Sequence, residues 1–385
     1  MKTLNMNKSI VYIFFMVCFM LFSCEKENNY LDEEKEDNNK PEVIGISTEL
    51  KSYEKAVSEL NKIISGDEIA NILCTELVVT TDGGFVTVND IYYDHILICK
   101  KNESGIIEWE LDYKIQGYSG FVANDIYETS DGSIMVTGSI TEINSENYIK
   151  DIYLVKISKK GEIVWEKIYN IDNVRGEANR VIETTDGGYA MVGTIHNSLE
   201  TEWIVVKTDE LGNINWSKRY ESGYGIGLGI IQTAEGYIIT GYTSSGYMNK
   251  IGKVIKIDED GNEIKDLNLP NGYVGGDIIA ANDGGYINLA VHLDTDTTQN
   301  GNTLSLIKLD ESLGIEWQKD HEGDHGFLDG PNRSFLSFLE YSQKIRNLLN
   351  TGYFIVTIDY DYSNNLFYYY ILKFNNSGDL IENEE

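Results

Sequence analysis

The chain has 385 residues, of which 62 are acidic and 31 are basic, so its formal net charge at pH 7 is −31. A surface this negative repels nucleic acids and anionic lipid headgroups, which excludes function classes that depend on a basic surface. Four cysteines are too few for a fold held together by disulfides. The 36 glycines, against three prolines, are typical of a fold with many tight turns.

Residues 1–23 have the pattern of a targeting segment. Two lysines precede an uninterrupted apolar run over residues 10–22. That run is short for a bilayer span but has the length of the hydrophobic region of a signal peptide. It ends in LFSC at residues 21–24, which resembles the bacterial lipobox. The resemblance implies cleavage before Cys24 and acylation of Cys24, with palmitate among the acyl chains. An uncleaved anchor or an ordinary signal peptide is the alternative.

Residues 24–41 are dense in carboxylates and almost free of apolar side chains. Such a segment cannot bury enough surface to fold, so we expect a disordered acidic tether. Acidic residues directly after the lipidated cysteine also resemble the surface-export signals of Bacteroidota lipoproteins. A merely soluble spacer is the other interpretation.

Residues 42–66 are expected to contain one short helix, within residues 47–64. Five apolar residues fall at helical spacing on one face of it. We expect this face to pack against the propeller described below, with binding of a partner as the alternative. The apolar residues are Leu50, Tyr53, Val57, Leu60 and Ile64.

Two landmarks recur in phase along residues 67–385, at intervals of about 50 residues, and predict six repeats. The first is an acidic residue followed by Gly, at Asp82, Asp131, Asp186, Glu235 and Asp283, with a degraded copy at Thr351-Gly352. The second is a Gly a few residues before a Trp, at Gly105/Trp109, Gly161/Trp165, Gly212/Trp216 and Gly314/Trp317. Lys265 and Glu382 stand in the Trp position of the fourth and sixth repeats.

Each repeat has the pattern of four strands, which in the third copy fall at residues 178–185, 188–195, 202–208 and 213–220. A single four-stranded antiparallel sheet cannot bury both of its faces, whereas sheets packed radially can. We therefore predict an all-β fold, a six-bladed β-propeller of four-stranded antiparallel blades, preceded by one short helix. Cys74 and Cys99 would lie on non-neighbouring strands, about 9.6 Å apart, and so remain free buried thiols.

The segments DIYLVKISKKGEIVW (151–165) and DGGYAMVG (186–193) resemble the propeller repeats common in secreted and surface proteins of Bacteroidota and some archaea. The hairpin that ends in Trp is similar to the tryptophan-docking hairpin of quinoprotein propellers. The resemblance implies the fold and says little about activity. Quinoprotein dehydrogenases usually have eight blades, and many have adjacent cysteines and a calcium site. This chain has six repeats and no adjacent cysteines, so we expect no quinone and no other cofactor.

The topology separates two faces. If the strands of each blade are named a to d from the channel outward, the a–b and c–d turns share one face. The b–c loops and d–a crossovers share the other, which carries nearly all the length variation and which we call the variable-loop face. Loops on a rigid scaffold commonly carry binding function. Aromatic rings on this face could stack on sugars or engage a peptide, or they could simply cover blade edges. The ligand-binding candidates are Tyr118, Tyr148, Tyr224, Tyr247, Tyr273 and Phe327.

No metal site is expected. The sequence DEDGNE at residues 258–263 occupies a repeated c–d turn and lacks the full ligand spacing of a calcium loop. A solvated polar loop is expected where imidazoles and carboxylates gather in the longest crossover, although such side chains could hold zinc. These metal candidates are His321, Asp324, His325 and Asp329.

The sequence favours a non-catalytic, lipid-anchored binding or scaffold protein at the outer membrane, and leaves open whether it faces the periplasm or the cell exterior. Its expected partners are the membrane, through the acyl chains on Cys24, and a glycan or envelope protein, with no nucleic acid. We expect a monomer. The alternative is a propeller enzyme of the glycoside hydrolase or lyase type, but among 62 acidic residues no catalytic pair stands out.

Overall fold

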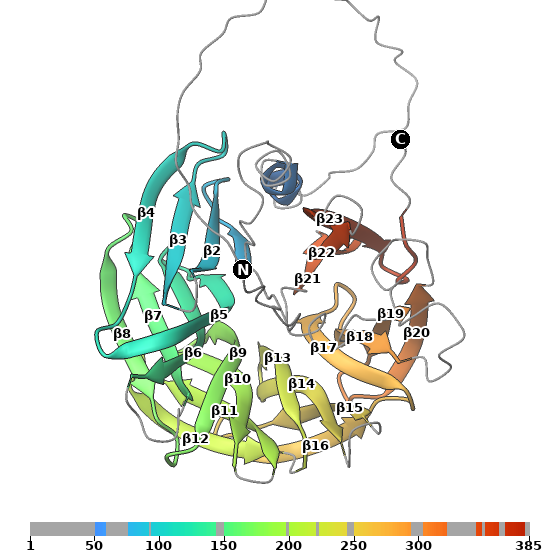
Figure 1. The fold of residues 1–385 in the computed structure, drawn as a ribbon. Helices are drawn as coiled ribbons and strands as arrows, with labels where there is room; N and C mark the ends of the chain where they lie inside the picture. Colours follow the sequence, from blue (N-terminus) through green and yellow to red (C-terminus); the bar gives the residue numbers. More distant parts are fainter. Residues whose placement is uncertain are drawn as a thin grey trace, which may run out of the picture.

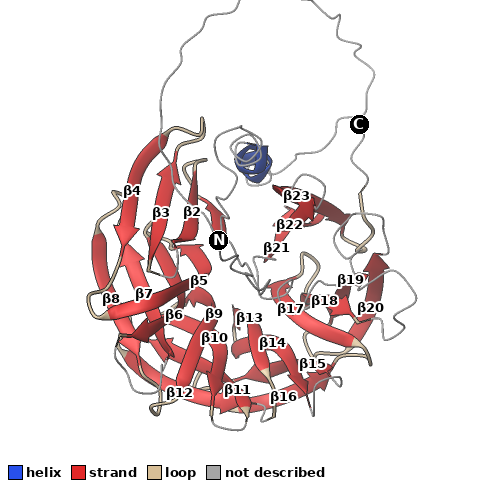
Figure 2. Cartoon of the chain, viewed as in Figure 1, coloured by secondary structure: helices blue, strands red, loops and turns tan. Residues whose placement is uncertain are grey.

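The computed structural model describes residues 51–58, 76–91, 94–143, 150–197, 200–220, 223–244, 250–293, 303–321, 344–348, 351–361 and 366–381. These residues form six antiparallel sheets that stand in a ring, each with its first strand nearest the centre (Figure 1). Strands dominate the fold, and one short helix lies beside them (Figure 2). The prediction of a six-bladed β-propeller is confirmed.

The strands follow in chain order from the centre outward within each blade. Blade one contains β1 (Glu76–Val79), β2 (Phe85–Ile91), β3 (His95–Lys101) and β4 (Ile107–Tyr113), and blade two contains β5 (Tyr118–Glu128), β6 (Ile134–Glu142), β7 (Lys150–Ile157) and β8 (Ile163–Tyr169). Blade three contains β9 (Arg175–Glu183), β10 (Tyr189–His196), β11 (Thr201–Thr208) and β12 (Ile214–Tyr220), and blade four contains β13 (Ile226–Thr233), β14 (Gly236–Ser244), β15 (Lys250–Ile257) and β16 (Glu263–Asn268). Blade five contains β17 (Tyr273–Ala280), β18 (Tyr286–His292), β19 (Thr303–Leu309) and β20 (Ile315–His321).

Blade six has three strands within the described residues: β21 (Lys344–Leu348), β22 (Gly352–Asp361) and β23 (Leu366–Asn375). After the turn at 375–379, Leu380 forms an isolated β-bridge with Phe374. Residues 344–348 are the innermost strand of the blade, because they pair in register with β22.

Repeated turns fix each hairpin, as the third blade shows. The Asp186 carboxylate accepts hydrogen bonds from the Thr184 hydroxyl (2.5 Å) and the Gly188 amide (3.0 Å), and it pairs with Lys207 at 2.8 Å. Partial burial acts to raise the pKa of Asp186, but the hydrogen bonds from Lys207, Thr184 and Gly188 outweigh it and hold the pKa at about 2. Gly187 supplies the positive φ of 82° that the turn requires.

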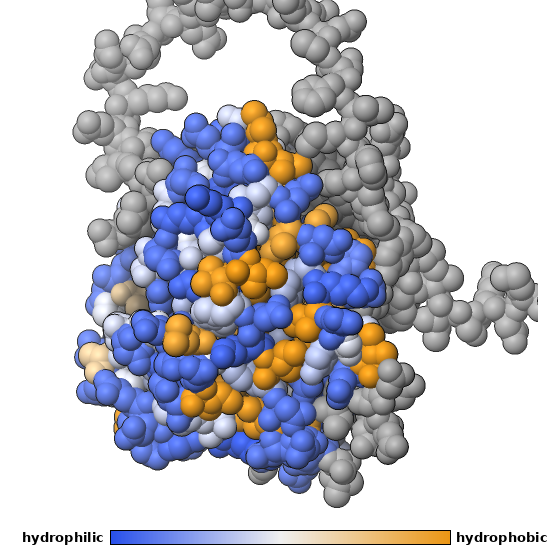
Figure 3. All heavy atoms as spheres, turned by 90° about the vertical axis from the view of Figure 1, so that its left-hand side faces the viewer, coloured by the Kyte–Doolittle hydropathy of each residue, from blue (hydrophilic) through white to orange (hydrophobic). Residues whose placement is uncertain are grey.

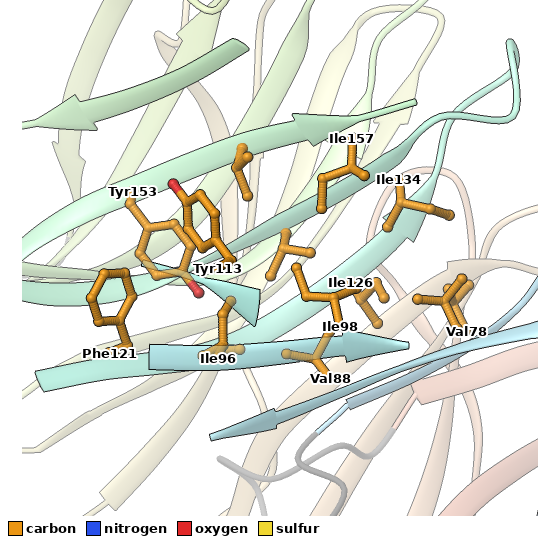
Figure 4. Close-up of a cluster of buried hydrophobic side chains, with 14 of the residues drawn as sticks. Val78, Val88, Ile96, Ile98, Tyr113, Phe121, Ile126, Ile134, Tyr153 and Ile157 are labelled. Atoms are coloured by element: carbon orange, nitrogen blue, oxygen red, sulfur yellow. The ribbon is translucent and has the colours of Figure 1, made fainter. Parts of the chain in front are cut away.

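The hydrophobic core lies between neighbouring blades, because both faces of every sheet carry buried apolar side chains. The cluster between blades one and two joins Val88 and Ile98 to Tyr153 of the next blade (Figure 4). The Tyr113 and Phe121 rings meet edge to face there, with their centroids 6.0 Å apart. Burial on both faces explains why inner strands such as β6 and β10 are nearly continuous apolar runs.

Tryptophan docking links the outer parts of the blades, as the resemblance implied. The Trp165 ring of blade two packs against Gly212 in the c–d turn of blade three, where an added Cβ would lie 2.9 Å from the ring. In the same way, Trp109 packs against Gly161, and its indole N–H donates to the Lys159 carbonyl at 2.9 Å. Glycine is therefore required at this position for two reasons. Its backbone has a positive φ, and the tryptophan ring occupies the space where a side chain would lie.

The structure corrects one repeat landmark. In blade five, the residue in the left-handed turn position is Leu313, with a φ of 62°, and not the neighbouring Gly314. Leu313 has a side chain where a docking tryptophan would lie. The preceding blade has Lys265 in place of that tryptophan, and its ammonium donates to the Ser312 carbonyl. The two departures from the repeat thus occur at the same interface.

The helix predicted within residues 47–64 is present over residues 51–58, with its flanks outside the described part of the chain. Its Tyr53, Ala56 and Val57 side chains are buried, and it lies at the gap between the first and last blades (Figure 1). The expectation that this helix packs against the propeller is therefore confirmed. Within the described ranges, no helix is long and apolar enough to cross a membrane.

Candidate functional site

The two faces of the propeller differ as the sequence predicted. Each c–d turn closes with the same hydrogen bond from its fourth residue to its first, from Gly105 to Asn102 in blade one through to Gly378 and Asn375 in blade six. The b–c connections of the variable-loop face instead range from residues 92–94 in blade one to 293–302 in blade five. Sequence differences between the repeats are therefore concentrated on one face.

The Gly-Tyr steps of three crossovers have a backbone explanation. Gly117, Gly223 and Gly272 all have positive φ, between 88° and 122°. Each carbonyl accepts a hydrogen bond from a neighbouring strand or loop, and the donors are the amides of Ile143, Thr201 and Leu293. The recurrence of glycine thus reflects how each crossover enters its innermost strand, and it does not by itself indicate a ligand.

Tyr273 is committed to contacts within blade five. Its side chain is buried, and its hydroxyl donates to the Asp320 carboxylate at 2.7 Å. The Gln318 amide donates to the same hydroxyl, and the His292 ring lies 4.5 Å away between centroids. Burial, together with the Asp320 carboxylate, raises the pKa of the Tyr273 phenol. This tyrosine therefore presents little of its surface to a ligand.

Tyr118 lies in a different environment. Its ring is half-buried against the apolar cluster between blades one and two. Burial and the nearby Asp151 and Glu142 carboxylates raise the pKa of its phenol. Tyr273 belongs to the cluster between blades four and five, so these two tyrosines pack at separate blade interfaces.

Tyr224 is the exposed member of the set, with 56% of its surface accessible. Its backbone is held on both sides, because the Tyr224 amide donates to the Ser244 carbonyl at 3.1 Å and residue 224 forms a parallel bridge with Thr201 of blade three. The Thr201 amide in turn donates to the Gly223 carbonyl at 2.7 Å. An aromatic ring exposed on a fixed backbone loses little conformational entropy when it binds a ligand.

The remaining candidates lie outside the described residues, so their part in binding a ligand stays a prediction. They are Cys24, Tyr148, Tyr247, Phe327, Asp324, His325 and Asp329.

His321 is described, and its ring packs on Phe374 with the centroids 4.8 Å apart. Burial lowers the pKa of this imidazole, although the nearby Asp320 and Asp379 carboxylates act in the opposite direction. Among the described residues, no three His, Cys, Asp or Glu side chains stand close enough to share a metal ion. Cys99 is buried and forms no disulfide within the described residues, as predicted, and Cys74 falls outside the described ranges.

The sequence analysis missed a cluster of buried ions at the centre of the ring. Lys344 of blade six contacts the Glu76 carboxylate of blade one at 2.9 Å and also pairs with Asp125 of blade two. The Arg180 guanidinium of blade three lies 3.4 Å from both Asp125 and Asp277 of blade five. The cluster thus ties the innermost strands of five blades together across the channel.

A positional signal for this cluster was present in the sequence. Glu76, Asp125, Arg180 and Asp277 each stand six residues before the acidic residue of the a–b turn, whereas blade four has Gly229 at that position. With Lys344 and Arg346 of blade six, the cluster contains three carboxylates and three cations, so its formal charges balance.

Burial raises the pKa of Glu76, and the adjacent Lys344 ammonium opposes this effect. Burial also acts to lower the pKa of Arg180, but the Asp277 and Asp125 carboxylates outweigh it and raise that pKa. Ions buried in balanced pairs are typical of a structural cross-link, and the Glu76, Asp125 and Asp277 side chains are at most 6% exposed.

Asp90, at the edge of this cluster, is a carboxyl with unusual chemistry. Burial raises its pKa to about 7, while the Ala123 amide of blade two donates to it at 3.1 Å and opposes that rise. The nearby Glu76 carboxylate raises the pKa further. A carboxyl that titrates near neutrality can act as a general acid if a substrate reaches it.

Comparisons with known proteins assign neither a family nor a function to the chain. No family model matches the chain, and no curated protein matches it. Similar solved structures include a protein of unknown function from Bacteroides caccae, with 14% identity, a TM-score of 0.45, and coverage of 75% of this chain and 89% of that one. An endo-arabinase from Bacteroides thetaiotaomicron has 11% identity and a TM-score of 0.43, and the match covers 82% of this chain and 96% of that one. A sialidase from Streptococcus pneumoniae has 11% identity and a TM-score of 0.48, and the match covers 80% of this chain and 68% of that one.

Proposed function

We propose that this chain is a lipid-anchored protein of the bacterial outer membrane that uses its variable-loop face to capture a glycan. The observation that carries the proposal is Tyr224, a ring 56% exposed on the face where the repeats differ, above a backbone fixed to blades three and four. Such rings stack on the apolar faces of sugars. The anchor rests on the lipobox-like sequence that ends at Cys24.

The first test is a glycan array probed with the full chain and with the Tyr224→Ala variant. Leu211→Ala is the matched control, because Leu211 is 57% exposed but lies in a c–d turn on the opposite face. Binding that Tyr224→Ala lowers tenfold or more, and that Leu211→Ala leaves unchanged, supports the proposal. Equal losses in both variants, or a loss only in Leu211→Ala, contradict it.

If no glycan binds, an envelope protein becomes the favoured partner, and crosslinking in intact cells through a photoreactive side chain at position 224 tests it. The anchor is tested separately with Cys24→Ala. That variant is expected to lose incorporation of labelled palmitate and to leave the membrane fraction, whereas Cys18→Ala, inside the apolar run, is expected to retain both.

A second candidate function is hydrolysis or lyase cleavage of a polysaccharide. The observation that favours it is Asp90, whose pKa of about 7 suits a general acid. Release of reducing ends from envelope polysaccharides, abolished by Asp90→Asn with glycan binding intact, would support catalysis over simple capture.

A further inference from the structure

The seam between blade six and blade one differs from the other five interfaces because the ring closes there. No strand is shared between the two blades, since each described sheet contains only strands of its own repeat. The helix at residues 51–58 fills this seam. Its Tyr53, Ala56 and Val57 side chains form one buried cluster with apolar residues of both blades. Those residues are Leu77 and Phe85 of blade one, and Phe354 and Val356 of blade six.

The contacts of the helix are divided between the two sides of the seam. The Tyr53 ring meets the Phe354 ring of blade six edge to face, with the centroids 5.3 Å apart. Tyr53, Ala56 and Val57 are at most 8% exposed, while Lys51, Lys55 and Ser58 face solvent. The helix therefore acts as a wedge between blades one and six, with one apolar face turned inward.

A repeated lysine shows that the helix replaces part of the sixth repeat. In blades one to five, the lysine two residues before the c–d turn pairs with the acidic residue of the a–b turn in its own blade. Blade six has the same lysine, Lys373, but its a–b turn has Thr351 in place of the acid. Lys373 pairs instead with Glu54 of the helix, at 2.5 Å. The helix thus supplies the carboxylate that the sixth repeat lacks.

Packing at the seam stabilises the helical state of residues 51–58. In proteins, most of the stability of a helix comes from tertiary packing of its apolar face, and the apolar face of these residues packs in the seam cluster. Loss of the seam contacts is therefore expected to loosen the helix as well. Proteins commonly open in such local units before the global transition.

From these observations we infer that residues 51–58 are a releasable latch, which holds the ring closed at blades one and six and whose release opens that seam while blades two to five stay folded. The open state exposes the apolar seam residues. It also frees Lys373 from Glu54, so electrostatics as well as packing hold the latch.

Hydrogen–deuterium exchange on the full chain tests the latch. Tyr53→Ala is expected to speed exchange at least tenfold in the helix, in β1 and in β22, and to leave β10 and β11 of blade three unchanged. Lys55→Ala is the matched control, because its side chain lies on the exposed face of the same helix. Faster exchange in all blades together would overturn the inference, as would a change confined to the helix.

A charge exchange tests the ion pair independently of packing. Glu54→Lys and Lys373→Glu are each expected to speed exchange at the seam several-fold, and the double variant is expected to restore the original rates. Failure of the double variant to recover, with each single variant folded, would show that the pair does not hold the latch. These outcomes are independent of whether Tyr224 binds a glycan.

Discussion

The interface between blades two and three and the seam between blades six and one join neighbouring sheets by different means. At the first, the Asn124 side chain donates to the Ala178 carbonyl at 2.9 Å, and the Ser130 amide donates to Glu183 at 2.7 Å. The Trp165 ring packs against Gly212 in the c–d turn of blade three. At the seam, the helix packs in one cluster with apolar residues of both blades, and Lys344 pairs with Glu76.

The difference shows what repetition can and cannot supply. Contacts that run from each blade to the next can be encoded once and copied, as the Asn124 contact is copied by Asn179, which donates to the Gly227 carbonyl at 2.8 Å. Closing the ring joins the first repeat to the last, and these two repeats do not follow one another in the sequence. A segment outside the repeats is therefore suited to this position, and the structure places one there.

The largest expected effect follows from breaking the centre of the ring. Lys344→Met leaves Glu76 and Asp125 buried with fewer positive partners, which is expected to cost about 3–5 kcal/mol of unfolding free energy. The control is Lys156→Met, because Lys156 pairs with the more exposed Asp131 and is expected to cost no more than about 1 kcal/mol. Urea unfolding measures both. Similar costs for the two variants would contradict a structural role for the central ions.

The second-largest expected loss of stability comes from disrupting the packing of Trp165 against Gly212. Gly212→Ala places a Cβ 2.9 Å from the Trp165 ring in a residue with φ of 76°, so we expect a cost of about 2–3 kcal/mol. Gly187→Ala shares the positive φ but has no atom within 4 Å of the added Cβ, and it is expected to cost about 1 kcal/mol. The difference between the two unfolding free energies measures the docking contact. Equal costs would mean that the Trp165 ring moves away from the added Cβ without further loss of stability.

The interface between blades one and two should make the stability of the fold depend on pH, through Asp90. Its pKa is raised from the unfolded value of about 4 to about 7, so the folded state holds the proton more tightly. This group therefore destabilises the fold progressively as pH rises from about 4 to about 7. Asp90→Asn is expected to be about 4 kcal/mol more stable than the parent at pH 8 and nearly equal to it at pH 4. Thermal unfolding at both pH values is the measurement, and a pH-independent difference would contradict this account.

The smallest expected effect concerns the interface between blades four and five, where Lys265 takes the place of the docked tryptophan. Leu313→Gly and Lys265→Trp together recreate the pair found at the other interfaces, whereas each alone leaves a mismatch. A double-mutant cycle is expected to give a favourable coupling of about 0.5–1 kcal/mol. Since Leu313 is 1% exposed, its replacement alone costs stability. A coupling of zero would show that the two departures from the repeat are independent.

The predictions from sequence succeeded where one contact is repeated and local. Asp186 and Gly187 revealed a hairpin because a tight turn needs a positive φ and a side-chain acceptor. The Gly314 landmark was displaced by one residue because leucine occupies a turn position where glycine was assumed. For the candidate site, Tyr118, Tyr224 and Tyr273 share a sequence context, yet only Tyr224 is exposed. Spacing gives the backbone position, but the side chain's surroundings depend on the adjoining blade.

The sequence by itself determined the number of blades, their four-strand pattern and the face that carries the variable loops, because these follow from periodicity and the alternation of strand direction. Only the tertiary structure decided that Lys373 pairs with Glu54 and that Lys344 meets Glu76 and Asp125 at the centre. These residues lie far apart in the chain, and closure of the ring brings them together. Their contacts depend on how six sheets share one axis, and no local pattern of residues specifies that arrangement.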